Sequence, residues 1–296
     1  MALPPHGITG STITGSTMPR RQLGRQLRDL RNRARMTTRV AAQRLEWSEA
    51  KIWRIETGQT SLRSLDVEAM CKVYGAPAEL VEPLAALARE TKARGWWTEF
   101  SDVIAEGFEV YIGLEEAAAR LFTYETDLVP GLLQSEEYTR AVLVGSRPDM
   151  SAADLERRIA VRAARQAAIT RDHSPIRLEA VITETLLWHR VGGPEVAVAQ
   201  LEHLRRMCDL PNVEVRVVPT DTGYHDGMDS GRFVLLEFPD SAGDVPEPPV
   251  VYVETFTGSV YYDKEPEIDR YRSAFTDIKA VAMDARTAID EARAAL

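Results

Sequence analysis

The apolar positions in the first third of the chain repeat with the spacing of short amphipathic helices. Leu23, Leu27 and Leu30 follow the i, i+4, i+7 pattern that places side chains on one buried helix face. Pro77 marks a break between two such segments, because proline cannot continue a helix. The pattern predicts five helices within residues 20–93, which cover residues 22–32, 37–45, 48–56, 65–74 and 78–92.

Residues 36–58, MTTRVAAQRLEWSEAKIWRIETG, predict two of these helices joined by a tight turn. Thr37 or Thr38 is suited to cap the first helix and Ser48 the second, because a side-chain oxygen there accepts a hydrogen bond from a free backbone amide. Gly58 is suited to end the second helix in a left-handed conformation. A helix, a tight turn and a second helix are what a protein needs to place one helix in the major groove of DNA.

Charge is divided unevenly along the chain. Residues 19–64 hold 12 Lys and Arg against 4 Asp and Glu, a net charge of +8. The whole chain carries −9 and residues 1–18 carry no charge, so residues 65–296 sum to −17. A basic segment on an acidic body suggests that only one end approaches a polyanion, while the acidic body repels DNA and helps to orient the protein.

In a helix-turn-helix unit the second helix enters the groove with its N-terminal end. Arg54 is suited to bind a guanine through two hydrogen bonds, and Glu49 to accept one from a cytosine amino group. Lys51 and Arg39 are suited to phosphates, which position a protein without reading sequence. Taken singly these are ordinary solvated charges, but the helix pair and the local basicity favour DNA binding. The residues predicted to contact DNA are Thr38, Arg39, Ser48, Glu49, Ala50, Lys51, Arg54 and Arg63.

Beyond residue 95 the pattern changes to a mixture of helices and strands. Helices are predicted from about Leu114, from about Ser135, and over residues 152–170, 194–207 and 267–296. Runs rich in β-branched residues predict strands over residues 176–183, 213–219, 233–238 and 250–255, and residues 240–249 are predicted to be a loop. Residues 94–296 are therefore predicted to form an α+β domain with a small sheet surrounded by helices.

The remaining composition narrows the class of protein. Residues 1–18 are uncharged and rich in Gly, Ser and Thr, so residues 1–19 are predicted to be a disordered arm and not a signal peptide. No apolar run approaches the roughly 20 residues that span a bilayer. Cys71 and Cys208 form neither a disulfide framework nor a zinc spacing, so we expect a cytoplasmic protein without a metal or cofactor.

Catalysis is not predicted for the larger domain. Its polar candidates are Glu184, His189, His203, His225 and Asp226. None of them belongs to a recognised hydrolase, metalloprotease or nucleotide-binding motif. His203 and Cys208 stand five residues apart, which does not place them on one helix face as zinc ligands. We expect ordinary surface or core roles for these residues, and no enzymatic activity.

Three features of the larger domain are candidates for binding a ligand or a partner. Residues 220–233 form a long polar loop that contains Tyr224 and His225; a flexible connection is the favoured alternative. Trp97 belongs to an aromatic set that is able to line a pocket, although such sets more often form the core that joins two domains. That set comprises Trp96, Trp97, Phe100, Phe108 and Tyr111. A row of arginines on one predicted helix is expected to be solvated; the alternatives are that it binds an acidic partner or DNA. The row comprises Arg157, Arg158, Arg162 and Arg165.

The first domain resembles the helix-turn-helix domain shared by phage repressors and xenobiotic-response-element regulators. The resemblance rests on LGRQLRDLR, the Ala41-Ala42 pair, KIWRIETG and MCKVYG. It implies a five-helix, lambda-repressor-like fold acting on repeated or palindromic operators. It also implies that Glu49, Ala50 and Arg54 face bases while Thr38, Ser48 and Lys51 face the DNA backbone. In the turn, Glu46 replaces a glycine that this family usually has.

The larger domain resembles actinobacterial regulators related to WhiJ, many of which are named antitoxin-like. The segments that carry the resemblance are WW, VPGLLQSEEYTRAVL, RQ, VITETLLWHRVGG, QLEHLRRM and VVYVET. The resemblance implies a transcription regulator that is often paired with a small protein encoded by a neighbouring gene, and it implies no catalytic residues.

Two functions therefore stand above the rest. The first is a sequence-specific transcription regulator that binds operator DNA as a homodimer and whose larger domain binds a partner protein or a small ligand. The alternative is an antitoxin-like interaction protein that sequesters a small partner and regulates its own operon. An enzyme fused to a DNA anchor is the least favoured.

Overall fold

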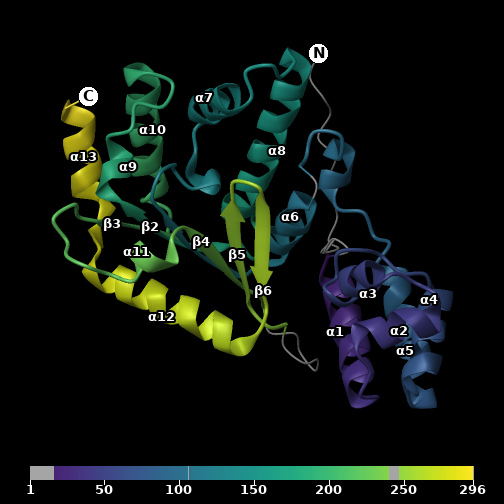
Figure 1. The fold of residues 1–296 in the computed structure, drawn as a ribbon. Coiled ribbons are helices and arrows are strands. Elements are labelled where there is room, and N and C mark those ends of the chain that lie inside the picture. The colour runs from purple at the N-terminus through teal and green to yellow at the C-terminus, as the bar shows by residue number, and fades with distance from the viewer. Residues whose placement is uncertain (1–16, 106, 240–246, 296) are drawn as a thin grey trace. The chain divides into compact units, whose positions relative to one another are not determined.

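A computed structural model describes residues 17–105, 107–239 and 247–295 of the 296-residue chain (Figure 1). The chain divides into two compact units, Met1–Thr98 and Glu99–Leu296. The first is helical and the second is an α+β unit.

The described part of the first unit folds into five α-helices, as the apolar spacing predicted. They are α1 (Thr17–Arg33), α2 (Thr38–Leu45), α3 (Glu49–Glu56), α4 (Ser64–Tyr74) and α5 (Ala78–Glu90). A short 3-10 helix, η1 (Trp96–Phe100), follows. Because α1 begins at Thr17, the last three residues of the predicted disordered arm are helical. The rest of that arm lies outside the described residues.

The helices of the first unit enclose one apolar core. Leu23 and Leu27 of α1 pack in it with Ile52 and Ile55 of α3, and all four side chains are almost fully buried. Gly24 lies where α1 meets the end of α3, since a Cβ at that position would stand 2.4 Å from the carbonyl oxygen of Ile55. This packing fixes α3 against α1 and leaves the opposite face of α3 to solvent.

The turn between α2 and α3 is set by local capping interactions. Thr37 Oγ1 accepts a hydrogen bond from the Val40 amide at 3.2 Å, and Ser48 Oγ accepts one from the Lys51 amide at 3.2 Å. Thr37 is therefore the cap of α2, and Thr38 is its first helical residue. Glu46 adopts the left-handed conformation (φ 55°, ψ 37°), which costs an L-residue roughly 1–2 kcal/mol. Glu46 thus holds a conformation that glycine adopts at a lower cost.

A buried ion pair joins α1 to α3. Arg31 donates from Nε to Glu56 Oε1 at 2.6 Å and from Nη2 to Glu56 Oε2 at 2.7 Å. Its Nη1 donates to Asn32 Oδ1 at 3.0 Å and to the Met36 carbonyl at 2.7 Å. The guanidinium is therefore bound on all sides, which offsets the free energy of removing it from water.

The second unit is an α+β domain (Figure 1). Its elements are α6 (Phe108–Ala117), β1 (Arg120–Glu125), η2 (Gly131–Leu133), α7 (Glu136–Ser146), α8 (Ala152–Thr170), β2 (Arg177–Thr183), α9 (Glu184–Leu187), α10 (Pro194–Met207), β3 (Val213–Val218), α11 (Gly227–Ser230), β4 (Phe233–Glu237), β5 (Val250–Thr255), β6 (Gly258–Tyr262), α12 (Glu265–Val281), β7 (Met283–Asp284) and α13 (Ala285–Ala295). The described strands form a seven-stranded mixed sheet in the order β6-β5-β4-β1-β2-β3-β7. The adjacent strands β1, β2 and β3 are parallel, and the remaining pairs are antiparallel.

Helices flank this sheet. Figure 1 shows α12 running across one face while α6, α8 and α10 lie on the other side. On the α12 face, Phe275 and Ile278 pack against Phe122, Phe233 and neighbouring apolar side chains of the strands. The predicted α+β class, with a sheet surrounded by helices, is confirmed.

Two predictions about this unit were wrong. The helix expected from about Leu114 begins at Phe108 and ends at Ala117, and the residues after it form the central strand β1. Four successive side chains of β1 are buried, so its sequence lacks the alternation of a half-exposed strand. The long C-terminal helix is two helices, α12 and α13, which the short edge strand β7 separates. The predicted loop at residues 240–249 lies mostly outside the described residues.

Candidate functional site

The N-terminal end of α3 presents the residues that were predicted to read bases. Glu49, Ala50 and Arg54 are all exposed, while Ile52 and Ile55 on the opposite side are buried. Helix α3 therefore offers one polar face with a single guanidinium and a single carboxylate. Guanidinium and carboxylate groups are able to form hydrogen bonds with the edges of base pairs.

Most of the residues predicted to contact phosphates are at least partly exposed. Arg39 and Ser48 are exposed, and Thr38 is half-buried at the first turn of α2. Arg63 precedes α4 and donates from Nε to Asp66 Oδ2 at 3.1 Å, which partly neutralises it. Lys51 is half-buried, and its Nζ lies 3.4 Å from the centroid of the Trp47 ring. This cation–π contact orients the ammonium beside the turn.

Sequence reasoning did not single out Trp53, although α3 exposes it. Its side chain is 54% exposed, between the buried Ile52 and the exposed Arg54. The sequence pattern indicated this exposure, because Ile52 and Ile55 define the buried face of the helix and position 53 lies outside that face. A large exposed ring on this face adds an apolar contact surface next to Arg54.

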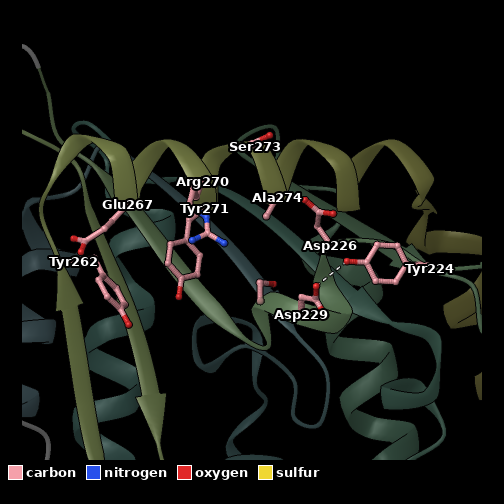
Figure 2. Close-up of a pocket in the computed structure, with 10 residues that line it drawn as sticks. Tyr224, Asp226, Asp229, Tyr262, Glu267, Arg270, Tyr271, Ser273 and Ala274 are labelled. Carbon is pink, nitrogen blue, oxygen red and sulfur yellow. Dashed lines mark hydrogen bonds between the residues drawn. The ribbon is translucent and has the colours of Figure 1, made fainter.

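The loop that was predicted to be site-like lies beside a cavity of the larger unit. This cavity has a volume of about 520 Å³ and is lined by Tyr224, Asp226, Asp229, Ser230, Tyr262, Glu267, Arg270, Tyr271, Ser273 and Ala274. Figure 2 shows that the lining residues come from the α11 segment, from β6 and from α12. The loop is ordered in part, because Gly227–Ser230 form helix α11, which packs on α12.

Tyr224 and His225, two of the residues predicted to bind a ligand, do not line the same cavity. Tyr224 lines the cavity and donates from its hydroxyl to Asp229 Oδ2 at 2.8 Å (Figure 2); this hydrogen bond raises the pKa of Tyr224. His225 is buried, accepts a hydrogen bond at Nδ1 from the Gly227 amide at 3.1 Å, and meets the Tyr124 ring edge-on. Trp97 is buried within η1, on the part of the chain assigned to the first unit.

The other polar candidates are dispersed over the second unit. Glu184 Oε2 accepts hydrogen bonds from both the amide and the hydroxyl of Thr220 at 2.7 Å, which lower its pKa. His189 Nδ1 lies 3.0 Å from the Asp127 carbonyl oxygen. Burial lowers the pKa of His203. Within the part of the chain that the structure describes, no group of three or more His, Cys, Asp or Glu side chains is arranged to hold a metal ion.

The arginine row of α8 does not form the solvated face that was expected. Arg165 is only 6% exposed and is paired with the equally buried Glu115 of α6. Arg157 donates from Nη2 to Asp102 Oδ1 at 2.6 Å and to the Glu99 carbonyl at 2.7 Å. The spacing of Arg158, Arg162 and Arg165 along α8 places all three on one side of the helix. On that side Arg165 is buried and Arg158 and Arg162 are partly buried.

Comparison with known proteins identifies two regions of the chain. Residues 22–84 match the family described as a helix-turn-helix domain. Residues 108–292 match the family described as a domain of unknown function, DUF5753. No curated protein and no solved structure matches the chain. Among the described residues, no helix combines the length and the apolar character that crossing a bilayer requires. The chain belongs to the DUF5753 family and carries a helix-turn-helix domain at its N-terminal end.

Proposed function

We propose that this protein is a sequence-specific DNA-binding transcription regulator. The observation that carries the proposal is the surface of α3: its N-terminal end is solvent-exposed and polar, and its opposite face is fixed in the core by Ile52 and Ile55. Arg54 would bind a guanine, and Glu49 would accept a hydrogen bond from a cytosine. Lys51, Arg39 and the first turn of α2 would contact phosphates on either side.

The distribution of charge supports this assignment. The net charge of residues 19–64 is +8, whereas residues 65–296 carry −17. Neutralised phosphates release condensed counterions, so a basic surface of this kind gains affinity that falls as salt rises. The acidic remainder would be repelled by DNA and would restrict the protein to orientations in which the first unit faces the duplex.

In this proposal the second unit binds a small ligand or a partner protein, and it has no catalytic step. A homodimer would bring two copies of α3 to half-sites about 34 Å apart, one turn of the duplex. The sequestering, antitoxin-like role is the alternative, and isolation of a stoichiometric small partner from the native host would favour it.

The test is the affinity of the full chain for the DNA directly upstream of its own gene, compared with a scrambled duplex of the same composition. Fluorescence anisotropy at several salt concentrations separates the specific from the electrostatic contribution. We expect a specificity ratio above roughly 10³ and a linear decrease of log affinity with log salt. Equal affinity for both duplexes at every salt concentration would contradict the proposal.

A further inference from the structure

A second cavity of the larger unit lies against the arginine side of α8. Its volume is about 310 Å³, within the size range of small-molecule sites. Arg158, Arg162 and Arg165 line it together with the rings of Phe108 and Tyr252 and the exposed carboxylate of Glu254. The remaining lining is mostly apolar and comes from the segment before α6, from α7 and α8, and from the β5–β6 hairpin. The cavity therefore carries more positive than negative charge in a unit that is acidic overall.

Arg165 is neutralised from within the protein. It donates from Nε to Glu115 Oε1 at 2.7 Å and from Nη2 to Glu115 Oε2 at 2.8 Å. Its guanidinium carbon also lies 5.1 Å from the Phe108 ring centroid and 5.4 Å from that of Tyr111. A pair of this geometry has no charge left for a ligand. The cavity's unbalanced charge must come from the arginines beside it.

Arg162 is that unbalanced charge. Its side chain is half-buried and has no hydrogen bond or ion pair with any described residue. Burial, and then the positive charge of Arg165, lower the pKa of Arg162 to about 10. Its guanidinium lies against Gly131 of η2, where an added Cβ would stand 2.0 Å from Nη1. A desolvated guanidinium without a partner destabilises a fold, so its presence calls for an anion.

Arg158 adds a second unsatisfied donor one helical turn away. Its Nε is buried and has no hydrogen-bond partner among the residues that the structure describes. Burial lowers the pKa of Arg158, and the nearby positive charge of Arg147 lowers it further. The single carboxylate of the lining, Glu254, lies 3.9 Å from Arg232. Two arginines of the cavity thus lack the counter-charge that Arg165 has.

We propose that this cavity binds a small molecule whose carboxylate or phosphate group meets Arg158 and Arg162 and whose apolar part packs against Phe108 and Tyr252. The planar guanidinium matches both kinds of oxyanion with paired hydrogen bonds. The apolar lining and the two rings provide the surface for the rest of the ligand. Binding of this ligand does not depend on the proposed function. Only the inference that the ligand controls DNA binding rests on the proposed function.

The test uses the full chain without DNA and titrates it calorimetrically with benzoate and with phenyl phosphate. Benzamide, which has the shape of benzoate without its charge, is the matched neutral probe. We expect at least one of the two anions to bind, and benzamide to bind at least tenfold more weakly than the tighter-binding anion. The proposal is overturned if neither anion binds, or if benzamide binds as tightly as the anions.

Three variants and one surface control locate the site. Arg162→Gln and Arg158→Gln should each weaken anion binding about tenfold or more, because each removes a charged hydrogen-bond donor. Arg190→Gln, an exposed arginine outside the cavity lining, should bind like the native protein. Gly131→Ala keeps every charge but displaces the Arg162 guanidinium, so it should also weaken binding. Unchanged affinity in both Arg162→Gln and Arg158→Gln would overturn the assignment.

Two further readouts keep the outcomes distinct. Arg162 has no carboxylate partner among the described residues, so Arg162→Gln should melt at or above the temperature of the native protein, which separates lost binding from lost folding. Anion binding is measured without DNA. A protein that binds benzoate through Arg162 but does not discriminate between duplexes would contradict the proposed function alone. A protein that discriminates between the duplexes but does not bind the anions would contradict the cavity assignment alone.

Discussion

Each unit of this protein buries an arginine that binds a glutamate through two hydrogen bonds, but the surroundings of the two pairs differ. In the smaller unit Arg31 and Glu56 are 10% and 4% exposed, and the remaining arginine donor is bound by Asn32 and Met36. In the larger unit Arg165 and Glu115 are 6% and 2% exposed. There, Arg162 adds a second guanidinium to which no described carboxylate is bound.

The difference separates a structural charge from a charge held for binding. The pair in the smaller unit is balanced and joins α1 to α3, so it holds the second helix of the helix-turn-helix motif in place. The pair in the larger unit also joins two helices, but the Arg162 guanidinium beside it has no ion-pair partner among the described residues. A protein keeps an unbalanced buried charge where it gains something other than stability, and a bound anion is the simplest such gain.

The largest predicted effect comes from breaking these pairs. Arg31→Met and Arg165→Met should each lower the free energy of unfolding by about 3–5 kcal/mol, because each leaves a buried carboxylate without its partner. The double variant Arg165→Met/Glu115→Leu should recover most of that loss. Urea denaturation followed by circular dichroism measures these changes, with Arg190→Met as a surface control. A loss below about 1 kcal/mol in either single variant would show that the pair is not structural.

A smaller effect follows from a partly buried carboxyl in the larger unit. Burial raises the pKa of Glu125 to about 7, although the charge of Arg232 opposes the shift; Glu254 and Asp127 add to it. The folded protein thus holds this proton more tightly than the unfolded chain. Its contribution to stability is complete below the unfolded pKa of 4.5 and is lost as the pH rises through 7.

As the pH rises from 5 to 8, the deprotonation of Glu125 should therefore lower the free energy of unfolding by about 2–3 kcal/mol. In Glu125→Gln that contribution should disappear, so the variant should lose less stability than the native protein over the same range. Denaturant titrations at the two pH values provide the comparison. Parallel pH profiles for the two proteins would mean that Glu125 is solvated and titrates normally.

The two units also differ in how much of them the sequence predicts. The helix-turn-helix region depends on local signals: the caps Thr37 and Ser48 and the buried pair Ile52 and Ile55 lie within a few residues of one another. Such signals can be recognised without knowing the rest of the fold. The sequence showed only that Glu46 stands where the resembled family usually has glycine, and the structure shows that Glu46 adopts a left-handed backbone there.

In the larger unit the decisive contacts connect distant residues. Strand β1 is buried by β2 and β4, whose sequences lie far from it, so its run of apolar residues could not be distinguished from helix. The arginine spacing along α8 was visible. Whether that side faced water or Glu115, fifty positions earlier in the chain, depended on the tertiary packing of α6. For the same reason, the sequence could not show that different neighbours surround Tyr224, His225 and Trp97.

The most direct test of the central claim is the response of DNA binding to two substitutions one turn apart on α3, read on the upstream duplex and on the scrambled one. Arg54→Ala should weaken binding to the upstream duplex by about 1–3 kcal/mol and relax the preference at one base pair, with much less change on the scrambled duplex. Lys51→Ala should weaken both duplexes alike and lower the salt slope by about one. Melting curves of both variants control for folding, since Lys51 also contacts Trp47. If Arg54→Ala weakened both duplexes equally, α3 would not read bases through Arg54, and sequence-specific recognition by this face of the helix would be contradicted.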